Sequence, residues 1–74
     1  MEKVIVFATS QQDAAEYMGT IGLDFESTVW VMNVQLLGTG DYSDHAVRYT
    51  DTFRKMPAYG EAVERFGEGA PDGV

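Results

Sequence analysis

Apolar residues along this chain form three short runs with the character of β-strands, separated by polar segments. Residues 3–8 and residues 28–32 are apolar on both phases of a strand. For residues 3–8 this pattern predicts burial on both faces of a sheet, whereas residues 28–32 could form an edge strand. Residues 45–53 instead alternate apolar and polar side chains, with Val47 and Tyr49 on the apolar face. That alternation predicts a half-exposed strand at the edge of the sheet.

Two further segments carry apolar residues at helical spacing. Ser10 is a candidate N-cap with Asp13 three residues later, and Gly22 suits the left-handed position that ends a helix. Pro57 suits the first turn of a second helix. Positions i, i+3, i+4 and i+7 hold Ala14, Tyr17, Met18 and Ile21 in the first helix and Tyr59, Ala62, Val63 and Phe66 in the second.

This order predicts an α/β fold of the form β-α-β-(turn)-β-α. The first strand–helix–strand unit should be parallel and right-handed, and the most apolar strand should be central, which gives a mainly parallel three-stranded sheet in the order 2-1-3. Residues 33–37 are predicted to form a helical turn with Leu36 and Leu37 at the edge of the core, followed by a loop. Only about eleven residues connect the second and third strands, close to the minimum for a parallel crossover, so an antiparallel third strand is the alternative.

Length and composition limit the classes of protein that this chain can belong to. Its 74 residues predict one compact domain over residues 1–66 and a flexible tail over residues 67–74. The longest apolar run has five residues and there is no cysteine, which predicts no membrane association and a cytoplasmic location. The net charge is −7, and no basic residue lies between Asp24 and Asp44, so we expect no nucleic-acid partner.

The turn after the first strand is where α/β sheets often bind phosphate groups. Thr9, Ser10 and Gln11 are therefore a weak candidate anion site, using the free N–H groups of a helix N-terminus. The turn lacks the glycine spacing of a dinucleotide fold and the lysine of a P-loop. Capping of the helix by Ser10 is the simpler interpretation, and no cofactor is predicted.

Catalytic and metal-binding patterns are incomplete. Asp41, Asp44 and His45 could surround a metal ion, but one histidine and no cysteine make a flexible polar loop the favoured interpretation. Ser10 precedes a helix as in a nucleophile elbow, yet the flanking glycines are missing. We therefore predict no catalytic residue, no metal site and no enzymatic activity.

The second strand raises the question of which aromatic and apolar residues stay exposed. Trp30 and Met32 share one of its faces, and two short helices cannot easily cover both faces of the sheet. With Phe25 and Tyr42 they form the candidate interaction surface, since an exposed apolar strip on a small protein usually marks a partner surface. The alternative is that the turn at residues 36–37 covers the strip.

Four short segments carry a resemblance to a known group of proteins. They are VIVFAT (4–9), AAEY (14–17), VWV (29–31) and QLLG (35–38). In these segments the chain resembles small α/β proteins of tailed phages, particularly phages of actinobacteria, and it is similar to a miniature RecA/Rossmann-like half without a phosphate loop. The resemblance implies a phage-encoded accessory or host-modulating role in the host cytoplasm, with no catalytic residues.

The leading hypothesis is a non-enzymatic, acidic protein-interaction module that binds a host or phage protein and self-associates as a homo-oligomer. One alternative is a small-ligand or nucleotide-binding remnant that uses the turn after the first strand. Another is an acidic mimic of nucleic acid, which would require Asp24, Glu26, Asp41 and Asp44 to lie on one flat face.

Overall fold

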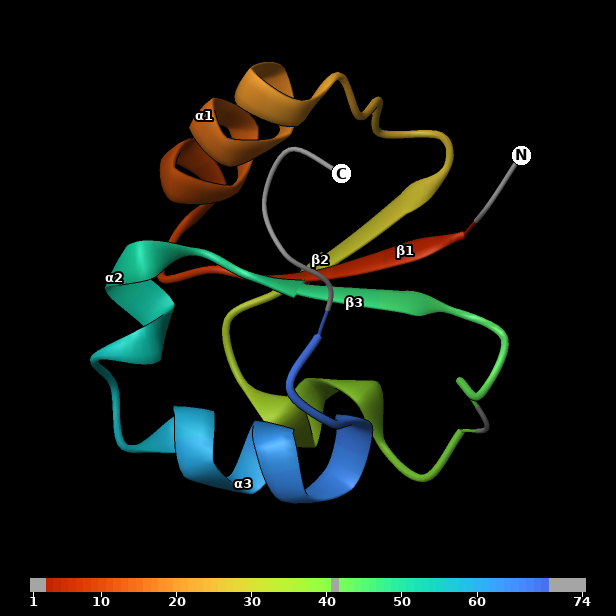
Figure 1. The fold of residues 1–74 in the computed structure, drawn as a ribbon, viewed down its shortest axis with the longest axis vertical. Helices are drawn as coiled ribbons and strands as arrows, with labels where there is room; N and C mark the ends of the chain where they lie inside the picture. The colour runs from red at the N-terminus through yellow and green to blue at the C-terminus, as the bar shows by residue number, and fades with distance from the viewer. Residues whose placement is uncertain (1–2, 41, 70–74) are drawn as a thin grey trace.

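The computed structural model describes residues 3–40 and 42–69 and contains a three-stranded parallel sheet in the order β2-β1-β3 (Figure 1). The central strand β1 (Val4–Phe7) pairs with β2 (Thr28–Val31) on one side and with β3 (Ala46–Tyr49) on the other. The predicted α/β fold and strand order are confirmed. The antiparallel alternative for the third strand is wrong, because β3 runs parallel to β1.

The central position of β1 follows from its composition. All of its residues are buried, and alternate side chains enter two separate apolar clusters. Ile5 and Phe7 belong to the larger cluster, whereas Val4 and Val6 belong to the smaller one on the opposite face. A strand without any polar side chain is stable only where both faces are covered, so it occupies the middle of the sheet.

One face of the sheet is covered by the helix α1 (Gln11–Ile21). Ser10 caps it as predicted, because its hydroxyl accepts a hydrogen bond from the Asp13 N–H at 3.1 Å. Gly22 ends the helix at φ 73°, and the Leu23 N–H donates to the Met18 carbonyl at 2.9 Å. The two local signals thus place the helix so that Met18 is buried against β1.

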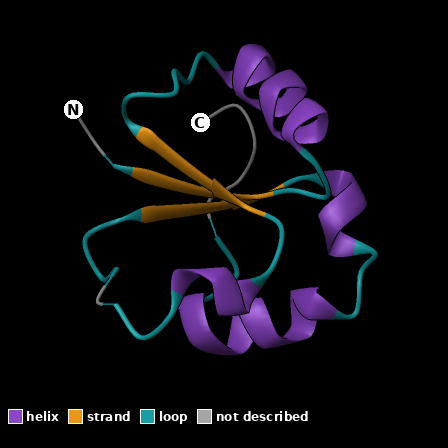
Figure 2. Ribbon diagram, turned by 180° about the vertical axis from the view of Figure 1, so that it is seen from behind, coloured by secondary structure: helices purple, strands orange, loops and turns teal. Residues whose placement is uncertain are grey.

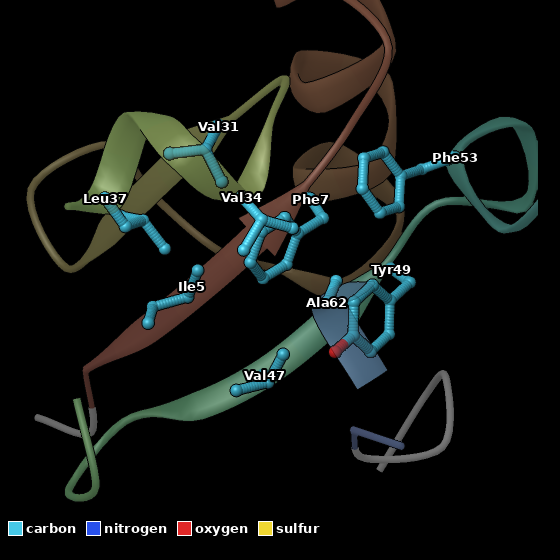
Figure 3. Close-up of a cluster of buried hydrophobic side chains, with 9 residues drawn as sticks. All are labelled: Ile5, Phe7, Val31, Val34, Leu37, Val47, Tyr49, Phe53 and Ala62. Carbon is cyan, nitrogen blue, oxygen red and sulfur yellow. The ribbon is translucent and has the colours of Figure 1, made fainter. Parts of the chain in front are cut away.

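The opposite face is covered by three shorter elements, η1 (Val34–Leu37), α2 (Asp51–Arg54) and α3 (Ala58–Phe66). In Figure 2, η1 and α3 lie below the sheet and α2 lies beside its end. The larger cluster forms between them and the sheet (Figure 3). Its centre is Phe7, whose ring lies 5.2 Å from that of Tyr49 and 5.3 Å from that of Phe53, measured between centroids. Its buried members are Ile5, Phe7, Val31, Val34, Leu37, Val47, Tyr49, Phe53 and Ala62.

Two predicted details are corrected. The third strand ends at Tyr49 instead of residue 53, because the Thr50 hydroxyl accepts a hydrogen bond from the Phe53 N–H at 3.2 Å and caps the helix α2. The turn at residues 34–37 is a 3₁₀ helix that buries Leu37, but Leu36 is 66% exposed and does not cover the core. A short helix therefore stands where the sequence predicted the end of a strand.

Candidate functional site

The crevice at the carboxyl ends of β1 and β3 is the position at which open α/β sheets most often bind ligands. The chain passes from β1 to β2 on one side and then to β3 on the other, so the strand order reverses beside β1. The turn at Thr9 and Ser10 and the turn at Thr50 therefore flank one crevice. The sequence predicted the first of these turns as a site but did not connect it with the second.

The carboxylate of Asp13 occupies this crevice. Its Oδ2 atom accepts hydrogen bonds from the turn at Thr9 and from the turn at Thr50. The donors are the Thr9 N–H (2.9 Å), the Thr9 hydroxyl (3.1 Å), the Thr50 hydroxyl (2.6 Å) and the Thr52 hydroxyl (2.6 Å). The side chain of Asp13 thus uses the donors that an external anion would need.

The hydrogen bonds to Asp13 also control its ionisation. Partial burial on its own would raise the pKa of this carboxyl, but the bonds from Thr50, Thr52 and Thr9 together outweigh burial and hold the pKa below its ordinary value. Asp13 is therefore negatively charged at neutral pH, and an incoming phosphate would meet that charge at close range.

A cavity of about 270 Å³ lies beside this cluster, between α1 and the start of α2. Its charged lining residues are all acidic, namely Asp13, Glu16 and Asp51. Anion binding by Thr9, Ser10 and Gln11 stays a prediction, and this environment disfavours it, because Ser10 caps the helix and the neighbouring charges are negative.

The loop before β3 holds the residues considered for a metal ion. His45 Nδ1 lies 2.8 Å from Asp44 Oδ1, and this hydrogen bond lowers the pKa of Asp44. Asp41 lies outside the described residues, and residues 3–40 and 42–69 contain no group of three or more histidine, cysteine or acidic side chains that could hold a metal. The absence of catalysis and of cofactors stays a prediction.

The four predicted interaction residues do not form one surface. Phe25 is 57% exposed and Met32 is 46% exposed, whereas Trp30 is half-buried against the cluster under α1. Tyr42 lies on the opposite side of the sheet, where its hydroxyl donates to the Leu37 carbonyl at 3.3 Å. Trp30 lies on β2, Met32 follows the strand directly and Phe25 lies in the loop before it, whereas Tyr42 is a core contact.

The sequence missed one exposed residue of the same strand. Val29 on β2 is 43% exposed, and it was not among the residues predicted for the interaction surface. We call the outer side of β2, with Phe25, Val29, Trp30 and Met32, the β2 edge. A signal that could have found it is the absence of any charged side chain from residues 27–40, in a chain that is 23% charged.

Hydrogen-bond directions show that backbone groups of the β2 edge point outward, away from β1, and have no partner within the described part of the chain. The Val4 N–H donates to the Ser27 carbonyl and the Ala8 N–H donates to the Val31 carbonyl, at 3.0 and 2.9 Å. Because a parallel ladder uses alternate residues, the odd-numbered residues of β2 face β1, and the N–H and C=O of Trp30 face away from it. Figure 2 shows β2 on the near side of the sheet, with no helix of the described chain across it.

The opposite edge of the sheet is covered. On β3 the carbonyl of Val47 points outward, and a Cβ placed on Gly69 would lie only 2.6 Å from that oxygen. The Tyr49 hydroxyl donates to the Gly67 carbonyl at 2.7 Å. Residues 67–69, the start of the predicted flexible tail, thus lie against β3, whereas residues 70–74 lie outside the described residues and their flexibility stays a prediction.

Comparisons with protein-family models, with curated proteins and with solved structures give no match to this chain. The resemblance to phage proteins and to a RecA/Rossmann-like half therefore stays a prediction. Within the described residues, no helix has both the length and the apolar character needed to cross a membrane.

Proposed function

We propose that this chain is a non-enzymatic, acidic protein-interaction module that binds its partner through the β2 edge. The observation that carries the proposal is an uncharged edge strand whose outward backbone groups are flanked by the exposed side chains of Phe25, Val29 and Met32. Such an edge is a template for another strand, which would supply main-chain hydrogen bonds and bury the flanking side chains.

The contrast between the two edges supports this assignment. Natural sheets that avoid edge-to-edge contacts place lysine, proline, a bulge or a covering segment at the edge. The β3 edge has Arg48 in its strand and Gly67 to Gly69 beside it, whereas β2 reads Thr-Val-Trp-Val and contains no such device. The β2 edge is therefore the part of the described surface most suited to binding a protein strand.

The nucleotide-binding alternative is less well supported. The negative charge of Asp13 stands where a phosphate would bind, and Glu16 and Asp51 add to it. The nucleic-acid mimic depends on Asp41, which lies outside the described residues. A role as a phage accessory protein in the host cytoplasm agrees with a surface-binding module and is part of the same proposal.

Affinity capture with a matched pair of variants tests the proposed function. Val29→Lys places a charge on the β2 edge, and Met56→Lys makes the same change at a residue that is 38% exposed in the turn between α2 and α3. We expect tagged wild-type protein and Met56→Lys to retain the same protein from a native lysate, and Val29→Lys to lose it. Equal retention by both variants would contradict a function at the β2 edge.

A further inference from the structure

The backbone of the β2 edge limits how any further strand can pair with it. The outward N–H and C=O groups near the middle of the strand belong to Trp30, since the neighbouring Val29 and Val31 use theirs toward β1. Thr28 is only 8% exposed, whereas Val29 and Met32 are 43% and 46% exposed. The accessible part of the edge is therefore centred on Trp30.

We propose that the β2 edge binds a second copy of this chain, antiparallel, with Trp30 of each copy at the two-fold axis. The Trp30 N–H of each copy donates to the Trp30 carbonyl of the other, which makes the central hydrogen-bonded pair of a continuous six-stranded sheet. This inference rests on the proposed function and names the partner. A two-fold axis makes the same patch serve both copies, and an antiparallel edge pair on a parallel sheet is a common arrangement.

The charge distribution selects the antiparallel direction. Asp24 and Glu26 precede β2, and the segment that follows Met32 is uncharged up to Gly40. Antiparallel pairing places the two acids of one copy toward the uncharged segment of the other. Parallel pairing would place the acids of both copies side by side, where like charges repel.

The side chains of the edge match in the same register. Val29 of one copy lies opposite Val31 of the other on the face toward α3, and Met32 lies opposite Thr28 on the face toward α1. The two Trp30 rings become neighbours on the α1 face, where aromatic cross-strand pairs are favourable. Phe25 of one copy lies at the end where Met32 of the other is exposed.

The contact is small, because β2 has four residues, and small interfaces belong to weak or transient complexes. The experiment therefore extends from about 10 μM to about 1 mM protein and uses probes inside the interface. Trp30 is the single tryptophan of the chain, so its fluorescence anisotropy reports on the edge directly. Its amide N–H points away from β1, so we expect fast exchange of this proton in the monomer and slow exchange in the proposed dimer, where it is hydrogen-bonded.

We expect sedimentation velocity to show a monomer–dimer equilibrium, with Trp30 anisotropy rising as the dimer forms. Exchange of the Trp30 amide should slow by about tenfold when the monomer falls to about a tenth of the population. Val29→Lys should remain monomeric with fast exchange at Trp30, and Met56→Lys should behave as the wild type. Melting curves of both variants check that each remains folded, and Met32→Lys is a second edge variant.

A dimer whose Trp30 amide exchanges at the same rate at all concentrations would overturn the proposed register. A wild-type monomer at 1 mM would overturn the second copy as partner. If that monomer still captures a protein that Val29→Lys loses, the proposed function stands with a different partner. If it captures none, both proposals fail.

Discussion

Removal of the Asp13 carboxylate is the most informative perturbation of the fold, because this one group joins two turns that are distant in sequence. It connects the start of α1 to Thr50 and Thr52 at the start of α2. We expect Asp13→Ala to destabilise the protein by about 2–3 kcal/mol at pH 7, with Asp13→Asn intermediate. A domain of 74 residues has a free energy of unfolding of roughly 4–11 kcal/mol, so this is a large fraction.

The magnitude follows from the hydrogen bonds at Oδ2. A hydrogen bond to a charged group contributes about 1.5–3 kcal/mol, but one oxygen cannot accept four bonds at full strength and Asp13 is only half-buried. We therefore count the equivalent of about two bonds at the low end of that range. The Thr50 hydroxyl is nearly fully buried, yet the Thr52 hydroxyl at 3.1 Å remains as a partner, which limits the additional loss.

The effect of Asp13 depends on pH with a definite sign. Its folded-state pKa lies below the ordinary value of 3.8, so its contribution is present above that value and is lost as the pH falls through the folded-state pKa. Urea denaturation at pH 7 and at pH 3 measures this difference. The gap in stability between wild type and Asp13→Asn should be constant from pH 7 to pH 5 and should shrink below about pH 4.

Glu16→Gln is the matched control, since Glu16 is an exposed carboxylate on the same helix and accepts a 3.3 Å hydrogen bond from the side-chain amide of Gln12. It should change the free energy of unfolding by less than about 0.5 kcal/mol. If Glu16→Gln lowers the free energy of unfolding as much as Asp13→Ala does, or if Asp13→Ala lowers it by less than about 0.5 kcal/mol, the Asp13 cluster does not stabilise the fold by joining the two turns.

Three further predictions concern other groups. The Thr28 hydroxyl is buried and has no hydrogen-bond partner within residues 3–40 and 42–69, so Thr28→Val should stabilise the protein by about 1 kcal/mol and raise the melting temperature by roughly 4–8 °C. An unchanged or lower melting temperature would contradict this. Burial, aided by Tyr59, raises the pKa of Tyr49 to about 12, so the wild type should lose stability between about pH 10 and pH 12. Tyr49→Phe should not show this loss of stability. At pH 7 it should be about 1 kcal/mol less stable than the wild type, because the hydrogen bond to the Gly67 carbonyl is removed. Titration with ATP or phosphate should leave the amide NMR shifts of Gln11 and Gln12 unchanged, because the nearby Asp13 is charged; saturable shifts there would restore the ligand-binding alternative.

The sequence predicted the strand order and the first helix because both depend on local or one-dimensional information. The residues of β1 are apolar on both phases, which is enough to place the strand in the centre. Ser10 and Gly22 mark the ends of α1 by hydrogen bonds within a few residues. These signals need no knowledge of the rest of the chain.

The short helix α2 escaped prediction because two periodicities coincide. Phe53 follows Tyr49 by four residues, and this spacing places two side chains on one face in a strand and also in a helix. The deciding group is the Thr50 hydroxyl, which caps the helix. Phe53 reaches the predicted apolar core from a different element, so the burial pattern alone could not distinguish the two.

The Asp13 cluster was missed for a different reason. The sequence assigned Asp13 to helix capping, but two of its donors lie 37 and 39 residues away. Their approach depends on β3 pairing beside β1, which sets the turn at Thr50 next to the turn at Thr9. A contact of this kind becomes predictable only when the strand order and the end of β3 are both known.

At Val29 of the β2 edge, the residue that favours solubility differs from the residue that favours binding. A lysine there would protect the edge from unwanted pairing and would leave the core intact, because the side chain is 43% exposed. The same chain covers its other edge with residues 67–69, so edge protection is present in this fold where a contact is not needed. If Val29→Lys gains solubility and loses every partner, the valine is maintained for binding. If it gains solubility and retains the captured protein, the open edge is an unprotected strand, and the interaction surface must lie elsewhere.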